Sequence, residues 1–409
     1  MTTTLNFGDC VSCTFESTQV THIQPAHQEA LPNTRLASDL REAFSNPLHF
    51  PPLASATVPG DSAVIALEYG VPQARQLVSG ALAALQDAGV EQSSVTLLLS
   101  SDFTDDTPSG EDLNELASAE QVQLLIHDPD EEQGTSLLGV TRAGRPLRLN
   151  RELCDADLVI SIGLSKLSSS AEQVPPSFSG LFPLFSDRET LERYRAPIAA
   201  DSKVIATERQ NEINEAGWLL GVGLTVQIVP NATGEVAALF VGEPAVVAKE
   251  ASAKYREIWA SPVDGAGDLI VATINGDASQ QTWQNVGRVI ELTEQGLEPG
   301  GALVIWTDLD EVPSGSLSRL AGNEDVEKIE RELMRDRLPD SWPAMLLCRA
   351  LQRGPVYLRS KLAASVVESL GLAPLSSADE LSRLSRNREH CMVIDDAQLL
   401  IPQFSAVAK

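Results

Sequence analysis

The sequence predicts an α/β protein with two domains, each a mainly parallel sheet flanked by helices, and a ligand cleft between the domains. Short, continuous apolar runs alternate with segments of helical periodicity, and such runs are typical of parallel strands buried on both faces. The chain has 409 residues, more than one ordinary core, since domains commonly hold roughly 100–200 residues. Turn-forming residues at 258–266 separate two such series. We therefore expect an N-terminal domain over residues 1–260 and a C-terminal domain over 261–409.

The N-terminal domain is expected to begin with an irregular segment over residues 1–60, containing short β-like pieces and one or two helical turns at 36–45. The first clear pattern is an apolar run at 63–67, followed by helical spacing over 74–89 that ends on a glycine. The same reasoning predicts further strands at 95–99, 124–126 and 158–162, and a helix over 110–119.

The C-terminal domain repeats the alternation. Its strands are expected at 268–274, 302–306, 355–359 and 391–395, and its helices over 280–295, 323–335, 341–353, 361–370 and 376–387. Open α/β sheets bind ligands at the carboxyl ends of their strands. A site is therefore expected in the loops that follow Leu67, Leu99, Ile162, Ile274 and Trp306.

The charge balance is strongly acidic, with 57 Asp and Glu against 30 Lys and Arg and a net charge of −27. The acidic residues are spread along the chain, so the balance argues against nucleic acid and anionic membrane surfaces as partners, because both need clustered basic residues. No apolar run approaches the roughly 18–20 residues of a membrane span, and the first residues do not resemble a signal peptide. Five cysteines in so long a chain favour a reducing, cytoplasmic location.

Several common motifs are missing or weak. No glycine-rich phosphate loop follows a predicted strand, and no Gly-x-Ser-x-Gly occurs. Cys10 and Cys13, followed by two histidines, are spaced more closely than in a zinc finger, and cysteines in β-like sequence are expected to be buried. His127 beside Asp128 at a strand end is expected to be structural.

A series of segments, in order along the chain, resembles the nickel-dependent lactate racemase family. The main ones are Leu40–Pro47, Leu138–Asn150, Asp155–Gly163, Phe178–Gly180 and Phe240–Pro244. The resemblance runs from about Phe7 to Phe404. It implies two α/β domains and racemisation of a 2-hydroxy acid. In that family a covalently tethered nickel-pincer nucleotide takes a hydride, and histidines carry the proton.

The residues that this reaction needs are replaced here. The tethering lysine of the family falls near Pro183, and the nickel-ligating histidine falls near Tyr194. A histidine that carries the proton falls on Ser168 or Gln173, and no histidine occurs anywhere between positions 128 and 389. None of the four side chains can form the bond, ligate the nickel as imidazole does, or act as a base near neutral pH.

The loops after the first two strands keep only part of the family's pattern. Its Asp-x-x-Arg-Pro matches Glu68, Val71 and Pro72, so the acid remains and the arginine that would bind a carboxylate is lost. Where the family has a catalytic histidine, the chain has an acidic loop that includes Asp102 and Asp105. Carboxylates there would repel a carboxylate substrate.

In the second domain the resemblance implies a glutamine and a lysine. Gln284 keeps the first, Gly287 stands at the second, and Arg288 points about 100° away on a helix. Trp342 matches an aromatic residue that the family places near its pocket. The candidate pocket residues are then Glu68, Asp102, Asp105, Ser179, Gln284 and Trp342.

The sequence thus supports two hypotheses. The first is a catalytically degenerate relative, for which no cofactor or metal is expected. Such a protein would bind a small ligand or a partner, or would keep only the fold. The alternative is a divergent racemase or epimerase, or another reaction run by Glu68, the loop around Asp102 and Gln284. In that alternative the acidic loop could hold a hard divalent cation. The ligand and the oligomeric state stay open.

Overall fold

The structure is a computed structural model that describes residues 2–7, 11–103, 108–131, 133–165, 177–178, 180–195, 203–322, 325–336, 338, 340–386 and 388–404. The chain divides into two compact units. The N-terminal unit comprises His27–Tyr194 and Ala200–Tyr255, and the C-terminal unit comprises Met1–Ala26, Arg195–Ala199 and Arg256–Lys409. Each unit is built on its own mainly parallel sheet, so the expected fold class is confirmed.

The sheet of the N-terminal unit has six strands in the order β10-β9-β8-β3-β4-β5. All are parallel except β10, which runs antiparallel to β9. The strands are β3 (Ala63–Leu67), β4 (Val95–Leu99), β5 (Gln123–Ile126), β8 (Leu158–Leu164), β9 (Thr225–Pro230) and β10 (Val236–Gly242). Every residue of β3 and β4 is buried, as continuous apolar runs predict for central strands.

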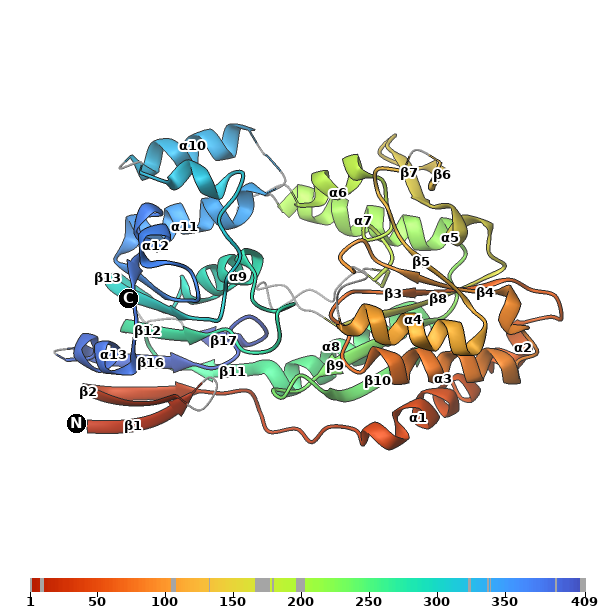
Figure 1. Cartoon of the computed structure of the whole chain (residues 1–409), viewed down its shortest axis with the longest axis horizontal. Coiled ribbons are helices and arrows are strands. Elements are labelled where there is room, and N and C mark those ends of the chain that lie inside the picture. The colour runs from red at the N-terminus through yellow and green to blue at the C-terminus, as the bar shows by residue number, and fades with distance from the viewer. Residues whose placement is uncertain are drawn as a thin grey trace. The chain divides into compact units, whose positions relative to one another are not determined.

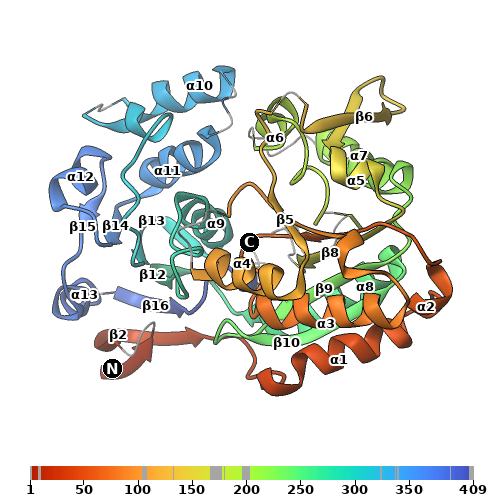
Figure 2. The same cartoon turned by 45° about the vertical axis from the view of Figure 1, so that its right-hand side comes forward.

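Helices cover both faces of this sheet (Figure 1), and each face has its own hydrophobic core. One contains residues of α1 (Asn33–Ser45), α2 (Leu53–Ala56), α3 (Ala74–Asp87) and α4 (Pro108–Glu120). Figures 1 and 2 both show α1 and α3 side by side. The other contains residues of α5 (Arg151–Asp155), α7 (Lys203–Leu219) and the turn before α6 (Arg188–Arg195).

A hairpin of β6 (Thr135–Val140) and β7 (Pro146–Asn150) precedes α5. Asn150 ends the hairpin and caps α5, since its side chain accepts a hydrogen bond from the backbone N–H of Glu152. Farther along, α8 (Pro244–Trp259) carries the chain from one unit into the other.

The C-terminal unit has a seven-stranded sheet in the order β1-β2-β16-β12-β13-β14-β15, parallel except for the β1–β2 pair. Its strands are β1 (Thr2–Phe7), β2 (Val11–Ile23), β12 (Gly267–Thr273), β13 (Leu297–Trp306), β14 (Val356–Arg359), β15 (Ala373–Pro374) and β16 (Arg388–Ile394). A small parallel pair joins β11 (Ala260–Val263) and β17 (Ile401–Phe404).

The helices of the C-terminal unit agree closely with the sequence-based expectation. They are α9 (Trp283–Thr293), α10 (Val326–Asp336), α11 (Ser341–Arg353), α12 (Ala364–Ser369) and α13 (Ala378–Leu384). Short 3₁₀ turns occur at Gln92–Ser94 and Leu317–Leu320.

The first residues differ from the expectation that 1–60 is an irregular part of the N-terminal domain. Residues 11–23 form a long strand, and β2 pairs with β16 from Ser17 opposite Arg388 to Ile23 opposite Ile394 (Figure 2). Residues 2–7 and 11–23 therefore extend the sheet of the C-terminal unit. The reason is that β16 would otherwise leave a row of backbone N–H and C=O groups unpaired.

Candidate functional site

Glu68 lies directly after β3 and joins the carboxyl ends of two neighbouring strands. Its carboxylate accepts a 2.8 Å hydrogen bond from the backbone N–H of Leu164, at the end of β8. Its own N–H donates to the carbonyl of Ile162 at 3.0 Å. A Cβ atom at position 163 would lie 3.0 Å from Oε2 of Glu68, so the absence of a side chain at Gly163 makes space for the carboxylate. The acidic residue expected from the sequence is thus at the strand ends and buried.

Two polar side chains that the sequence did not single out share this face. Gln227 of β9 lies opposite Gly163, and side chains of paired residues project from the same face. Ser165 is two residues beyond Gly163 and so projects from that face as well. Both are buried, and neither the hydroxyl of Ser165 nor Oε1 of Gln227 has a hydrogen-bond partner among the described residues. Buried polar atoms without a partner are uncommon in native proteins.

The segment that begins at Gly180 packs against this edge. The Cα atom of Gly180 would lie 3.3 Å from a Cβ atom on Gly163, so the two backbones pack directly. Leu181 and Phe182 continue into the core of this face. Ser179 itself lies outside the described residues.

The loops after β3 and β4 are packed by apolar and aromatic side chains. Val71, at the position of the family's arginine, is buried in the core. The rings of Tyr69 and Phe103 meet edge to face with centroids 5.0 Å apart. Asp102, next to Phe103 in the chain, is exposed, and Asp105 lies outside the described residues. The described residues of these two loops include no arginine that could bind a carboxylate as the family's arginine is expected to do.

Tyr194, near the expected nickel ligand, belongs to a closed polar network. Its hydroxyl donates to the carboxylate of Glu212 at 3.0 Å and lies 3.2 Å from the carbonyl of Arg209. Arg193 donates twice to the same carboxylate, at 2.6 and 2.8 Å. The guanidinium groups of Arg193 and Arg209 lie 5.0 and 5.2 Å from the tyrosine ring centroid.

This surrounding keeps the hydroxyl protonated. Burial is the main cause that raises the pKa of Tyr194 well above its ordinary value, and the neighbouring Glu212 carboxylate raises it further. A protonated phenol that already donates to a carboxylate has little capacity to ligate a metal. Pro183, at the tether position, lies between buried Phe182 and Phe185 and has no amine.

His127 is structural, as the sequence predicts. Its Nε2 donates to the carbonyl of Ser186 at 2.8 Å, and its Nδ1 accepts from the side-chain amide of Asn150 at 3.1 Å. Burial lowers the pKa of His127. The neutral ring therefore ties β5, β7 and the turn before α6 together.

In the C-terminal unit, Gln284 and Trp342 flank Gly287 of α9. Gln284 is exposed. A Cβ atom at position 287 would lie 2.8 Å from Cζ3 of Trp342 and 3.2 Å from the Cα atom of Pro343. The position of the family's lysine is therefore filled by the tryptophan ring.

Two positions that the resemblance implies for a tethered nickel-pincer nucleotide carry other side chains. Pro183 has no amine for a covalent bond, and the hydroxyl of Tyr194 donates to Glu212. Over the described ranges, no three His, Cys, Asp or Glu side chains are grouped so that they could hold a metal ion. None of the helices in those ranges is long and apolar enough to cross a membrane.

The fold defines an α/β protein with two mainly parallel sheets, and comparisons with known proteins show what it is similar to. Residues 9–167 match the family described as the lactate racemase N-terminal domain. This stretch of the chain is therefore a lactate racemase N-terminal domain, and the chain as a whole shares the fold of a lactate racemase.

Two solved structures share the fold over almost the whole chain. The lactate racemase apoprotein from Thermoanaerobacterium thermosaccharolyticum has a TM-score of 0.77 at 16% identity, covering 98% of this chain and 100% of its own. A Thermotoga maritima protein has a TM-score of 0.67 at 12% identity, covering 93% of this chain and 100% of its own. No curated protein sequence matches the chain.

Proposed function

We propose that this protein keeps the lactate racemase fold without the nickel-dependent reaction, and that it binds a small polar ligand at the strand ends around Glu68. The observation that carries the first part is the Tyr194 network. If Tyr194 had simply replaced a metal ligand and taken no other role, its side chain would need no specific contacts. Tyr194 instead donates to Glu212, and two arginines flank its ring, so the position has become part of the packing.

Three further positions support the loss of the reaction. Pro183 offers no amine for a tether. Val71 is buried in the core where the family needs a cation. Gly287 is covered by Trp342 where the family needs a lysine. Restoring the reaction would require several changes that each disturb packing, and not one substitution alone.

The second part is supported by the unpartnered polar atoms. Ser165 and Gln227 lie on the same face as the Glu68 carboxylate, buried at the carboxyl ends of parallel strands, where α/β proteins bind ligands. A carboxylate and an amide oxygen accept hydrogen bonds, and a hydroxyl does so too. The set therefore favours a ligand that donates several hydrogen bonds, such as a polyol or an amino sugar.

The loss of nickel chemistry is tested by co-expression with the enzymes that make the nickel-pincer nucleotide. Intact mass, nickel content and the interconversion of L- and D-lactate are then measured, with a lactate racemase that has the tether lysine as the positive control. We expect an unmodified mass, no bound nickel and no interconversion. A covalent nickel adduct would contradict the proposed loss of the nickel-dependent reaction and would favour a divergent racemase.

The ligand site is tested by thermal shift with polyols, amino sugars and 2-hydroxy acids. Gln227→Met and Ser165→Ala remove the unpartnered atoms with little change of shape. Since no group among the described residues bonds those atoms, we expect both variants to melt at or above the wild-type temperature while losing the ligand-induced shift. If no compound raises the melting temperature of the wild type, or if the variants keep the shift, the site is elsewhere.

A further inference from the structure

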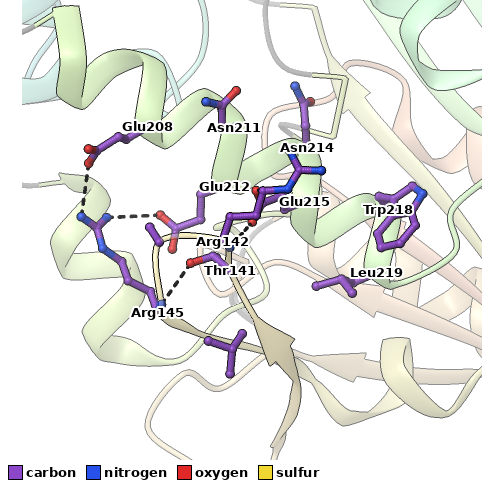
Figure 3. Close-up of a pocket in the computed structure, with 12 residues that line it drawn as sticks. Thr141, Arg142, Arg145, Glu208, Asn211, Glu212, Asn214, Glu215, Trp218 and Leu219 are labelled. Atoms are coloured by element: carbon purple, nitrogen blue, oxygen red, sulfur yellow. Dashed lines mark hydrogen bonds and ion pairs between the residues drawn. The ribbon is translucent and has the colours of Figure 1, made fainter.

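A pocket of about 540 Å³ lies between α7 and the turn that joins β6 to β7, entirely within the N-terminal unit (Figure 3). Its floor includes Glu212, the carboxylate that holds Tyr194 and Arg193. The pocket is thus backed by a fixed polar network. Its volume falls within the range of pockets that bind other molecules, roughly 300–1,000 Å³.

Apolar side chains stand exposed around this pocket. Trp218 is 77% exposed, Val140 59% and Leu219 37%. Leu137, on the same strand as Val140, is 56% exposed. Single exposed apolar residues are ordinary, but a group of them beside a hollow marks an interaction surface. Trp is also among the residues most enriched at the energetic centres of protein interfaces.

The charges around the pocket balance each other. Arg145 lies 3.4 Å from Glu208, and the backbone N–H of Arg142 donates to Glu215 at 3.0 Å while its guanidinium lies 3.8 Å away. Arg142 and Arg145 thus oppose Glu208 and Glu215, and Arg193 pairs with Glu212, on a chain whose net charge is −27. Two copies of so acidic a chain repel each other over most of their surface. This patch is a place where a second copy meets little repulsion.

The patch offers an exposed ring, a hollow and charges of both signs. Trp218 is exposed and stands beside the hollow that it helps to line. In Figure 3, Trp218 and Leu219 lie at one end of the pocket and Glu208 at the other. The side chain of Arg142 is 95% exposed and that of Glu208 is 48% exposed, so both remain available to a partner.

We propose that two copies of this chain associate through this patch about a two-fold axis. Trp218 of each copy enters the pocket of the other, and Arg142 of each meets Glu208 of the other. A two-fold contact uses the same surface on both copies. One patch must then supply the inserted side chain, the pocket that receives it, and charges of both signs. One buried tryptophan contributes about 150–250 Å². This is a fraction of the roughly 800 Å² per partner in a standard interface, so we expect a dimer that dissociates on dilution.

Sedimentation equilibrium of the full chain over a range of concentrations tests the proposal. We expect a monomer–dimer equilibrium that Trp218→Ser weakens at least about tenfold. The matched control is Val312→Ser, which removes an apolar side chain that is 66% exposed in the other unit, and it should leave the equilibrium unchanged. A wild type that stays monomeric at every concentration overturns the proposal and leaves the pocket to another occupant. A dimer that Trp218→Ser does not weaken overturns it as well.

A charge exchange gives a second readout that does not depend on the tryptophan. Arg142→Glu and Glu208→Arg each place like charges opposite one another in a homodimer, so each should associate more weakly than the wild type. Mixed together, the two variants restore both opposite-charge contacts and should form a heterodimer. If the mixture associates no better than either variant alone, the two-fold arrangement is wrong. Neither outcome bears on the ligand site at Glu68 or on the nickel reaction.

Discussion

The ring of Trp342 occupies the space that a side chain at Gly287 would need. A Cβ atom there would lie 2.8 Å from Cζ3 of the ring, closer than real Cβ contacts, and 3.2 Å from the backbone of Pro343. Glycine in the middle of a helix is otherwise unfavourable by about 1 kcal/mol relative to alanine. The glycine in α9 is therefore explained by its contact with α11.

Gly287→Ala should destabilise the protein although alanine is the better helix former. Overpacking costs about 1–3 kcal/mol and the gain in propensity offsets about 1 kcal/mol, so we expect a net loss of up to about 2 kcal/mol in the free energy of unfolding. Urea denaturation measures it. The loss should shrink or reverse in a Trp342→Leu background, which removes the facing ring. An equal effect in both backgrounds would mean that Trp342 is not the obstacle.

Tyr194→Phe should lower the free energy of unfolding by about 1–2 kcal/mol, because the variant loses a hydrogen bond to a charged acceptor. The hydroxyl donates to Glu212, which is 4% exposed. Glu212→Gln should cost more, since it removes the carboxylate that Arg193 and Tyr194 share. Glu192→Gln, on an exposed residue of the same helix, is the control and should have little effect. Equal stability of Tyr194→Phe and wild type would remove the structural role assigned to this tyrosine.

Local sequence patterns predicted the central elements well. The apolar run at 63–67 is β3 and the helical spacing over 74–89 is α3, ending at Asp87. The strand is buried on both faces and the helix on one face, and each kind of burial gives a recognisable pattern of apolar residues in the sequence. The Cζ3 contact at Gly287 left no such signal, because it depends on how α11 packs against α9.

Two of the features that the sequence did not predict are set by pairing between distant residues. The addition of β2 to β16 joins residues about 370 positions apart. The shared face of Glu68, Ser165 and Gln227 follows from the register of three strands, which no local pattern records. By contrast, the acid at position 68 was predicted, because the resemblance placed it directly after a strand.

The described cysteines should be slow to react with thiol reagents at pH 8. Burial is the main cause that raises the pKa of Cys154 to about 11 and that of Cys348 to about 12. Burial also raises the pKa values of Cys13 and Cys391. Thiolate is the reactive form, so little of it is present in the folded protein. Peptide mass spectrometry after brief iodoacetamide treatment should find these four residues labelled only in denaturant. Rapid labelling of Cys348 without denaturant would contradict its burial.

His127 should make the protein less stable as the pH falls below its ordinary pKa of 6.5. Burial lowers the pKa of His127 in the folded state, and Nδ1 already accepts from Asn150, so a second ring proton would face a donor. Between the folded pKa and 6.5 the unfolded chain binds the extra proton and the folded chain does not. Stability therefore rises with pH across this window and is lost as the pH falls through it, at up to about 1.4 kcal/mol per pH unit.

Comparison of urea unfolding at several pH values for wild type and His127→Gln isolates this contribution, since the slope of stability against pH should be shallower in the variant. If that variant does not fold, the NMR titration of the His127 ring in the wild type gives the same answer. A ring that titrates at pH 6.5 would remove the expected effect, and one that titrates above pH 6.5 would reverse its sign.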